Sequence, residues 1–142
     1  MYVENGGICQ CKPGTYNNTV TCTECAQLFL GCLECDDTHC TLCDSAKFYD
    51  HAGAGCGCMT GFLSNNGKCE DCSTLIYGCN TCTLATVCDT CDHSVFFIES
   101  GYGTCICQVG YYDTSLKSCK LCSDDLRGCT MCNDRIRCIE CD

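Results

Sequence analysis

Residues 56–91 read CGCMTGFLSNNGKCEDCSTLIYGCNTCTLATVCDTC, which is one C-x-C pair followed by three C-x-x-C pairs. The same order of pairs occurs once before this stretch and once after it, and equivalent gaps within the unit differ by at most one residue. The C-x-C pairs begin at Cys9, Cys56 and Cys105, so the unit recurs after 47 and then 49 residues. Self-similarity at such a period indicates a repeat architecture. We therefore predict three cysteine-rich repeats, over residues 1–47, 48–95 and 96–142.

All 24 cysteines belong to these pairs, and we expect every one of them to take part in a disulfide. In the first repeat they are Cys9, Cys11, Cys22, Cys25, Cys32, Cys35, Cys40 and Cys43. In the second repeat they are Cys56, Cys58, Cys69, Cys72, Cys79, Cys82, Cys88 and Cys91. In the third repeat they are Cys105, Cys107, Cys119, Cys122, Cys129, Cys132, Cys138 and Cys141.

The composition predicts a small disulfide-rich fold without a large apolar core. The chain has 142 residues and no tryptophan, and its hydrophobic fraction of 46% includes cysteine. Ordering a chain costs on the order of 1–2 kcal/mol per residue, and a disulfide that closes a short loop returns about 2–4 kcal/mol. About twelve disulfides would therefore replace the missing core, although their contributions do not simply add.

Other residues repeat beside the cysteines and predict loops, small hairpins and single helical turns. A glycine and an aromatic residue follow each C-x-C pair, as in Gly61-Phe62, and we expect the aromatic ring to lie across a disulfide. A short run such as Leu75-Ile76-Tyr77 ends at Gly78, which predicts one helical turn with a glycine stop. Runs before each C-x-C pair predict hairpin arms that close at glycines. These runs are Tyr2-Val3-Glu4, Phe48-Tyr49-Asp50 and Val95-Phe96-Phe97-Ile98.

The connections between repeats are short, and the chain contains one proline, Pro13. A chain without flexible linkers predicts repeats that stack on one another, and hence an elongated tandem array. The runs Leu28-Phe29-Leu30 and Leu75-Ile76-Tyr77 have two interpretations. They either cover disulfides inside the unit or leave one side exposed for a neighbouring chain, and the polar third copy around Leu126 favours the first.

Charge and compartment exclude several classes of function. The chain has 18 acidic and 8 basic residues and a net charge of −10, whereas binding to phosphates requires clustered lysine and arginine, so we expect no nucleic-acid partner. Dense, even cysteine usage indicates an oxidising, extracellular or cell-surface location. Asn17-Asn18-Thr19 is a glycosylation sequon, which makes Asn17 a candidate glycan site and glycans expected partners.

No segment has the length and apolarity of a membrane span. Residues 1–5 have neither the basic start nor the apolar stretch of a signal peptide. We therefore expect the chain to be a mature product or an excerpt of a longer precursor.

Zinc is the rival chemistry for paired C-x-x-C motifs, because four thiolates at such spacing form structural zinc sites. The 24 cysteines would suffice for six such sites. The pairs are, however, too crowded and too uniformly spaced for separate zinc ribbons, and the chain has twelve aromatic residues, which metallothioneins usually lack. The sequence favours disulfides and no bound metal.

No catalytic constellation is apparent in the sequence. His39, His51 and His93 fall at unrelated positions of the repeat, whereas a catalytic or metal site needs groups that converge. Acidic pairs at Asp36-Asp37 and Asp124-Asp125 are more typical of solvated surface than of a calcium site in so acidic a chain. Nucleotide-binding, hydrolase and metalloprotease signatures are absent. We predict that the chain is not an enzyme and has no cofactor.

The C-x-C-x-x-Gly-aromatic segment, as at Cys56 to Phe62, resembles the closing half of an EGF-like module. The C-x-x-C pairs that follow resemble furin-like, growth-factor-receptor cysteine-rich repeats. The combination over the whole chain most resembles cysteine-rich surface proteins of protists, in ciliates and Giardia. These families serve as coats, stalks and receptor ectodomains, so the resemblance implies a fold and a compartment more than a function.

The EGF resemblance also implies part of the disulfide map, although eight cysteines closed within one repeat allow 105 pairings. It implies Cys11–Cys22, Cys58–Cys69 and Cys107–Cys119. It also pairs Cys56 with Cys40 or Cys43, and Cys105 with Cys88 or Cys91. Cys9 and one of Cys138 and Cys141 would then lack partners and would be available for bonds between chains. The alternative is that Cys9 closes within its own repeat.

The sequence therefore favours a structural repeat protein of an extracellular fibre or cell-surface coat, which self-associates as a homo-oligomer or filament. The alternative is a receptor or adhesin ectodomain that binds a protein or a glycan. A binder should have one repeat with divergent loops, and the third repeat diverges most, around residues 124–127 and 133–137.

Overall fold

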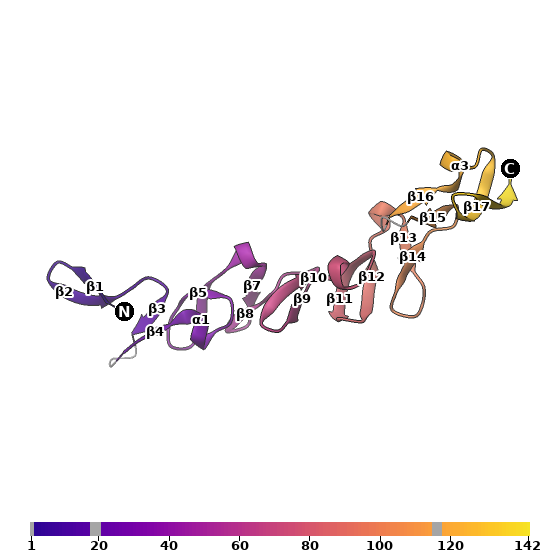
Figure 1. Ribbon diagram of the computed structural model, residues 1–142. Helices are drawn as coiled ribbons and strands as arrows, with labels where there is room; N and C mark the ends of the chain where they lie inside the picture. The colour runs from indigo at the N-terminus through magenta and orange to yellow at the C-terminus, as the bar shows by residue number, and fades with distance from the viewer. Residues whose placement is uncertain (1, 18–20, 115–117) are drawn as a thin grey trace. The chain divides into compact units, whose positions relative to one another are not determined.

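The computed structural model describes residues 2–17, 21–114 and 118–142, without the side chains of Ile8 and Cys9. In these ranges the chain forms nine two-stranded sheets between consecutive strands, with three α-helical turns and two 3-10 turns between them (Figure 1). Its internal contacts divide it into two compact units, Met1–Thr60 with Ser64–Cys69, and Gly61–Leu63 with Glu70–Asp142. The prediction of a disulfide-rich fold of short hairpins and helical turns is confirmed. The EGF-like and furin-like identity, the elongated array and the three-domain division stay predictions.

The first unit contains β1 to β8. These strands are β1 (Tyr2–Asn5), β2 (Ile8–Cys11), β3 (Thr15–Asn17), β4 (Cys22–Glu24), β5 (Cys32–Cys35), β6 (Cys40–Cys43), β7 (Tyr49–Ala52) and β8 (Gly55–Cys58). Helix α1 (Cys25–Leu28) and the 3-10 turn η1 (Ser45–Lys47) belong to the same unit.

The boundary between the units falls in β9 (Phe62–Asn65) and β10 (Lys68–Asp71). The second unit contains β11 to β18, with helices α2 (Cys72–Leu75) and α3 (Cys122–Asp125) and the 3-10 turn η2 (His93–Val95). Its strands are β11 (Cys79–Leu84), β12 (Val87–Cys91), β13 (Phe97–Glu99), β14 (Cys105–Cys107), β15 (Tyr111–Asp113), β16 (Cys119–Leu121), β17 (Cys129–Asp134) and β18 (Arg137–Cys141).

Each α-helix begins at the second cysteine of a C-x-x-C pair. The amide of Cys72 donates to the carbonyl of Gly61 over 2.9 Å, and equivalent bonds start α1 and α3. Gly61 has a φ of 89°, in the left-handed region that glycine adopts without steric cost. The helical turns lie three residues before the expected ones. After α2, Ile76 is extended, and Tyr77 and Gly78 form a turn in which Gly78 has a φ of 70°.

The predicted hairpins at the C-x-C pairs are present, but two of them begin later than expected. β1 begins at Tyr2 as predicted, whereas Phe48 and Val95-Phe96 precede β7 and β13. Phe48 and Phe96 end the 3-10 turns with φ values of 64° and 68°. Their carbonyls accept bonds from the amides of the residues that follow the C-x-C pairs, over 2.9 Å in each case.

The described residues have an interior of three small clusters, and cystine sulfur dominates all three. One cluster lies in the first unit, around Cys25, Cys32, Cys40, Cys43 and Tyr49. Two lie in the second unit, one around Cys72, Ile76, Cys79, Cys88, Cys91 and Phe97 and the other around Tyr112, Cys122, Cys129 and Cys132. The most buried side chains in the described residues are the helix-starting cysteines Cys25, Cys72 and Cys122.

The aromatic residues of these clusters are not the expected ones. Phe62 and Tyr111, which follow the glycines after the C-x-C pairs, are only half-buried, and Tyr111 stacks on Phe96 at 4.3 Å. The buried rings are those of Tyr49, Phe97 and Tyr112, at 4%, 3% and 6% exposure. Tyr49 and Phe97 each open a hairpin and pack on cystines of the hairpin before it, whereas Tyr112 in β15 packs on Cys122, Cys129 and Cys132.

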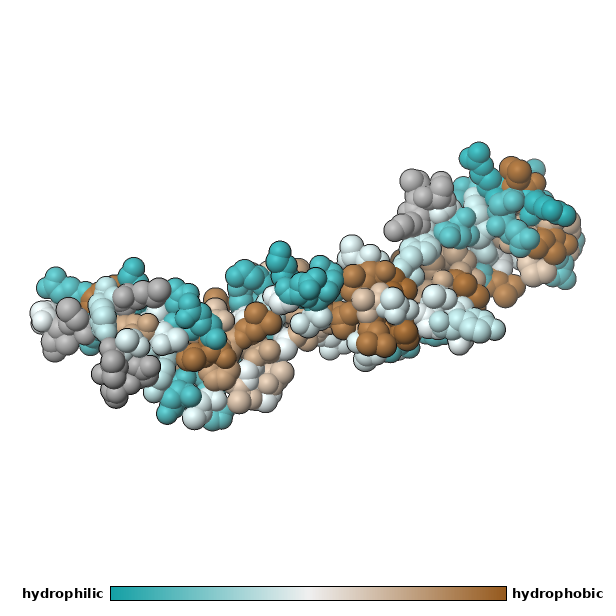
Figure 2. Space-filling view, turned by 60° about the horizontal axis from the view of Figure 1, so that its bottom comes forward, coloured by the Kyte–Doolittle hydropathy of each residue, from teal (hydrophilic) through white to brown (hydrophobic). Residues whose placement is uncertain are grey.

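The apolar runs divide between the interior and the surface. Ile76 is buried and Phe29 packs on the first cluster, whereas Leu28 and Leu30 are 46% and 52% exposed. Figure 2 shows hydrophobic patches beside hydrophilic ones on the face that it draws. The interpretation that these runs cover disulfides therefore holds for the middle residues, Phe29 and Ile76. In the described ranges, no helix has the length and apolarity needed to span a membrane.

Candidate functional site: the joints between repeats and a polar pocket

Among the side chains that the structure describes, eleven disulfides join 22 cysteines. Three close the hairpin after each C-x-C pair, as the EGF resemblance implies: Cys11–Cys22, Cys58–Cys69 and Cys107–Cys119. Three tie each helix to the next strand: Cys25–Cys35, Cys72–Cys82 and Cys122–Cys132. Three cross the following hairpin: Cys32–Cys40, Cys79–Cys88 and Cys129–Cys138.

The last two disulfides, Cys43–Cys56 and Cys91–Cys105, join one repeat to the next. In both, the first cysteine of a C-x-C pair bonds to the preceding repeat, as the resemblance implies. The partners are Cys43 and Cys91, the second of the two candidates in each case. We call the two places the first joint and the second joint. The first lies wholly in the first compact unit and the second wholly in the second unit.

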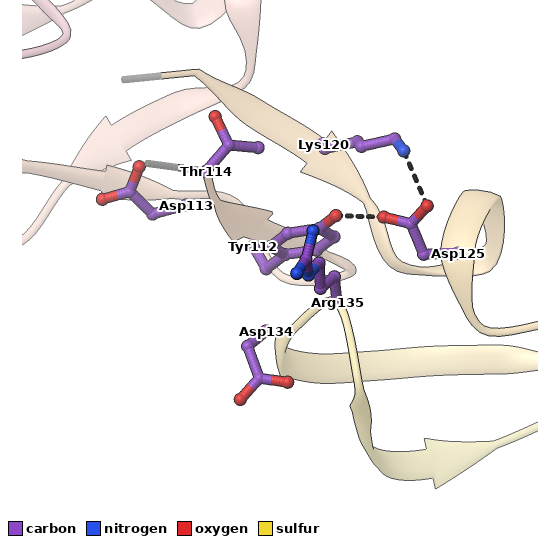
Figure 3. Close-up of a pocket in the computed structure, with 7 residues that line it drawn as sticks. All are labelled: Tyr112, Asp113, Thr114, Lys120, Asp125, Asp134 and Arg135. Carbon is purple, nitrogen blue, oxygen red and sulfur yellow. Dashed lines mark hydrogen bonds and ion pairs between the residues drawn. The ribbon is translucent and has the colours of Figure 1, made fainter. Parts of the chain in front are cut away.

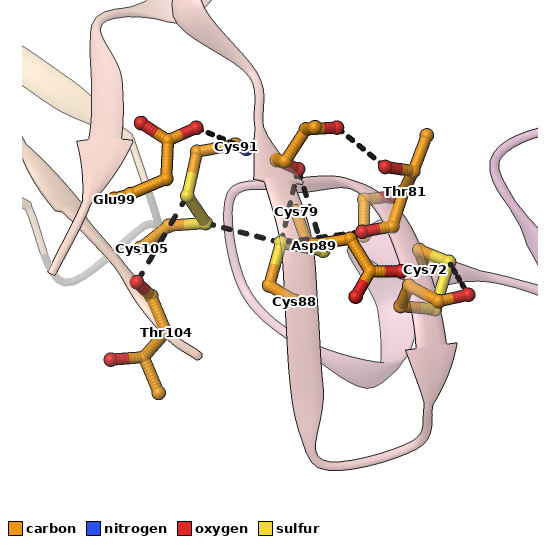
Figure 4. Close-up of a disulfide and its surroundings, with 12 residues drawn as sticks. Cys72, Cys79, Thr81, Cys88, Asp89, Cys91, Glu99, Thr104 and Cys105 are labelled. Carbon is orange, nitrogen blue, oxygen red and sulfur yellow. Dashed lines mark hydrogen bonds between the residues drawn. A yellow bond between two sulfur atoms is a disulfide. The ribbon is translucent and has the colours of Figure 1, made fainter. Parts of the chain in front are cut away.

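Each joint stacks two disulfides and an aromatic ring. In the second joint, drawn in Figure 4, the sulfur of Cys105 lies 3.4 Å from that of Cys88, so that the crossing disulfide and the linking disulfide touch. The same sulfurs in the first joint, Cys56 and Cys40, are 3.2 Å apart. The amide of Cys88 donates to the carbonyl of Gly103 over 2.8 Å, which ties the strand to the hairpin of the next repeat.

The ring of each joint packs against a glycine that admits no side chain. A Cβ on Gly78 would lie 2.6 Å from Cγ of Phe97, and one on Gly31 would lie 2.4 Å from Cγ of Tyr49. Distances this short mean that only glycine allows the ring to lie there. Tyr77 adds an edge-on contact with Phe97 at 4.8 Å between ring centroids. The sequence pattern contained this signal, since Gly-Cys follows each apolar run and an aromatic residue opens each hairpin.

Charged groups cover the second joint. The carboxylate of Glu99 accepts from the amide of Cys91 over 3.0 Å and contacts Nε2 of His93 at 2.9 Å. The bond from the Cys91 amide, followed by the contact with His93, lowers the pKa of Glu99 to about 2. In the first joint Lys47 pairs with the buried Asp44 at 2.7 Å and lowers its pKa.

The sulfur clusters at the joints also have the residue types of a metal site. The three sulfurs of Cys32, Cys40 and Cys56 lie within 4.8 Å of one another, as do those of Cys79, Cys88 and Cys105. A metal binds the thiolate form of cysteine, and each of these sulfurs is bonded to another sulfur. The proximity therefore reflects stacked disulfides. These positions have no free thiolate that could bind zinc.

A polar pocket with a volume of about 560 Å³ lies in the third repeat, beside β15 and β16 (Figure 3). The Tyr112 hydroxyl donates to the Asp125 carboxylate, and Nζ of Lys120 lies 2.7 Å from the same carboxylate. These bonds lower the pKa of Asp125 and raise the pKa of both Lys120 and Tyr112. Tyr112 and Lys120 are thereby held in their protonated forms, which suits a polar contact surface better than proton abstraction.

The histidines, Asp36 and Asn17 that were singled out in the sequence do not line this pocket. His39 contacts Thr38 at 2.6 Å in a turn where Asp36 accepts from backbone amides, and His51 lies 3.8 Å from the Cys43 sulfur. Asp36 and Asp125 are thus both occupied by hydrogen bonds within the chain. Asn17 is exposed at the end of β3, whereas Asn18 and Thr19 of its sequon lie outside the described residues.

Two cysteines remain outside the disulfides described above. Cys141 is exposed and unpaired, and the side chain of Cys9 lies outside the described part of the structure.

Comparisons with protein-family models, with curated proteins and with solved structures find no match to this chain.

Proposed function

We propose that this chain is a non-enzymatic structural segment of an extracellular fibre or cell-surface coat, stiffened by its disulfides. The observation that carries the proposal is the design of the joints. At both of them a buried aromatic ring and a linking disulfide fix one repeat to the next, so the connection between repeats is packed and covalent.

The disulfides stabilise the fold by restricting the unfolded chain. Their sequence separations run from 8 for Cys32–Cys40 to 14 for Cys91–Cys105. Loops of this size correspond to about 3 kcal/mol for each disulfide in the chain-entropy model. Because every cluster in the interior is small, this covalent contribution takes the place of apolar burial. Resistance to heat, denaturant and protease follows, which are properties that a coat or fibre requires.

The compartment proposed here follows from the same bonds. Disulfides at this density persist in oxidising environments and are rare in the cytosol. The many disulfides, together with the finding on membrane helices, are consistent with an extracellular or secreted protein. A glycan on Asn17 would add a hydrated group to the surface. The resemblance to protist surface proteins points to the same location.

Electron microscopy of the purified, unreduced protein tests the proposal. A coat or fibre protein should form filaments or ordered sheets as its concentration rises. The competing function is that of a receptor or adhesin, and the pocket at Lys120 and Asp125 in the divergent third repeat favours it. Dispersed particles at every concentration, together with saturable binding of a glycan or protein that is lost in Lys120→Ala, would reject the structural role.

A further inference from the structure

The polar pocket of the third repeat occupies positions at which the second repeat has apolar packing. Counted from the second cysteine of the C-x-C pair, Tyr112 is equivalent to Leu63. Counted from the cysteine that starts the helix, Asp125 is equivalent to Leu75. Leu63 and Leu75 pack against the cystine cluster of the second repeat. Because sequences give up such packing mainly at functional sites, the exchange points to a function for the pocket.

Hydrogen bonds within the chain hold the inner wall of the pocket in place. The Asp125 carboxylate accepts from the Tyr112 hydroxyl with one oxygen, and Nζ of Lys120 lies 2.7 Å from the other (Figure 3). Tyr112 is 6% exposed, so its hydroxyl is fixed against the carboxylate. An ammonium group has three N–H donors, which leaves two on Lys120 for a ligand.

The rim of the pocket carries two carboxylates that are also fixed. Oδ1 of Asp134 accepts from the amides of Ile136 and Arg137 over 2.8 Å each, which orders the turn between β17 and β18. Oδ1 of Asp113 accepts from the Tyr77 hydroxyl of the second repeat over 3.0 Å. Within the described residues the second oxygen of each carboxylate has no partner, so each can accept a bond from a ligand.

Arg135 brings the main donors of the pocket. It lies in the turn that Asp134 orders, and it is exposed. Among the residues that the structure describes, its guanidinium has no hydrogen-bond or ion-pair partner. A guanidinium carries five N–H donors in a planar fork, so Arg135 can bind two neighbouring oxygen atoms at once.

The balance of charge selects the class of ligand. The pocket combines the carboxylates of Asp113, Asp125 and Asp134 with the cations of Lys120 and Arg135. An anion would meet three carboxylates in a chain with a net charge of −10, and a cation would meet two basic side chains. A neutral ligand with several hydroxyl groups avoids both penalties, because each hydroxyl can donate to a carboxylate and accept from a basic group.

The size of the pocket agrees with such a ligand. Its volume of about 560 Å³ lies within the range of about 300–1,000 Å³ that is typical of small-molecule sites. All seven lining residues have polar side chains, whereas sites for apolar ligands have mainly apolar ones.

We propose that the polar pocket binds a neutral sugar unit of a glycan, with Arg135 as the main donor and Asp113 and Asp134 as acceptors. Lys120 and Asp125 form the inner wall against which the sugar lies. The proposal goes beyond the structural function and does not depend on it. A coat or fibre protein with this site would attach to neighbouring glycans through its third repeat.

An NMR titration of the disulfide-intact, ¹⁵N-labelled protein tests the site. The probes are neutral trisaccharides of mannose, galactose, glucose and N-acetylglucosamine, and their charged counterparts are trimers of galacturonic acid and of glucosamine. We expect at least one neutral sugar to shift the amide signals of Tyr112, Ile136 and Arg137 in a saturable way, with a millimolar Kd. The acidic and basic trimers should bind more weakly.

Variants of the rim test the assigned contacts. Arg135→Ala should weaken binding about tenfold, because it removes hydrogen bonds from a charged group. Asp134→Asn should also weaken binding, and it keeps an oxygen that accepts from the Ile136 and Arg137 amides, so the turn is retained. The matched control is Arg127→Ala, which removes an exposed arginine of the same repeat that does not line the pocket. That variant should bind with the wild-type Kd.

Three results would overturn the sugar site. The first is the lack of a saturable shift with every neutral trisaccharide at about 0.1 M, well above a millimolar Kd. The second is wild-type affinity in both Arg135→Ala and Asp134→Asn. The third is tighter binding of the galacturonic acid or glucosamine trimer than of any neutral sugar. Filaments formed by a chain that binds none of the sugars would reject the site and leave the structural function standing.

Discussion

Substituting Gly78 by alanine should open the second joint, and Gly128 provides a matched control at the equivalent position of the third repeat. Both glycines have positive φ, 70° and 76°, and both precede a disulfide-bonded cysteine. They differ in what a new methyl group would meet. At Gly78 it would lie 2.6 Å from Cγ of Phe97, and at Gly128 nothing lies within 4 Å.

The expected losses follow from these two differences. A side chain in the left-handed region costs about 1–2 kcal/mol, which applies to both variants. Gly78→Ala must also displace the Phe97 ring, which loses a further 1.5–3 kcal/mol or so of burial. We therefore expect a loss of about 2.5–5 kcal/mol for Gly78→Ala and about 1–2 kcal/mol for Gly128→Ala.

Native-state hydrogen exchange measures this difference locally, which avoids assuming that the whole chain unfolds in one step. The amides of Asp92 and Asp142 are matched reporters, because they donate to the carbonyls of Gly78 and Gly128 at equivalent positions. Both variants are made in a Cys141→Ser background so that the exposed thiol of Cys141 forms no intermolecular disulfide. Equal loss of protection in the two variants would refute the role of the ring in closing the joint.

Three further predictions concern the joint charges, the linking disulfide and the glycan. Because the pKa of Glu99 falls from 4.5 to about 2 on folding, its stabilising effect is complete above pH 4.5 and is lost as the pH falls toward about 2. NMR titration of Glu99 should give this pKa, and Glu99→Gln should reduce the loss of stability at acid pH. A normal pKa for Glu99 would contradict the hydrogen bonds assigned to its carboxylate. Replacing Cys91 and Cys105 together by alanine should cost about 3 kcal/mol and make the segment between them sensitive to protease, and unchanged proteolysis would show that the disulfide does not hold the joint. Native protein should lose the mass of a glycan on treatment with an N-glycosidase, and Asn17→Gln expressed in the same secretory host should not. A wild-type chain that loses no glycan mass would exclude a glycan at Asn17.

The cysteine pattern predicted the repeat, the small disulfide-rich fold and the hairpins at the C-x-C pairs. The spacing of the eight cysteines left the partners of Cys25 and Cys32 open, because that choice depends on how β5 and β6 pair, which spacing does not determine. The EGF resemblance supplied Cys11–Cys22 and its equivalents, since that hairpin is local in the chain. The same resemblance left the partner of Cys56 open between Cys40 and Cys43.

The aromatic assignment failed for a related reason. Sequence alone placed the core ring beside the nearest disulfide, at Phe62, whereas the buried ring at Tyr49 packs on Gly31 of the preceding hairpin. A contact between successive hairpins depends on tertiary structure and has no local periodicity. The polar pocket of the third repeat was missed too, since Tyr112, Lys120 and Asp125 meet only when β15, β16 and α3 come together.

The most direct test is to denature the native protein without reductant, alkylate it with iodoacetamide and weigh the intact chain. The account predicts that the 22 cysteines of the 11 disulfides take up no label, and that the mass rises by about two units per disulfide after reduction. Label at the joint residues Cys43, Cys56, Cys91 and Cys105 in the unreduced chain would contradict it.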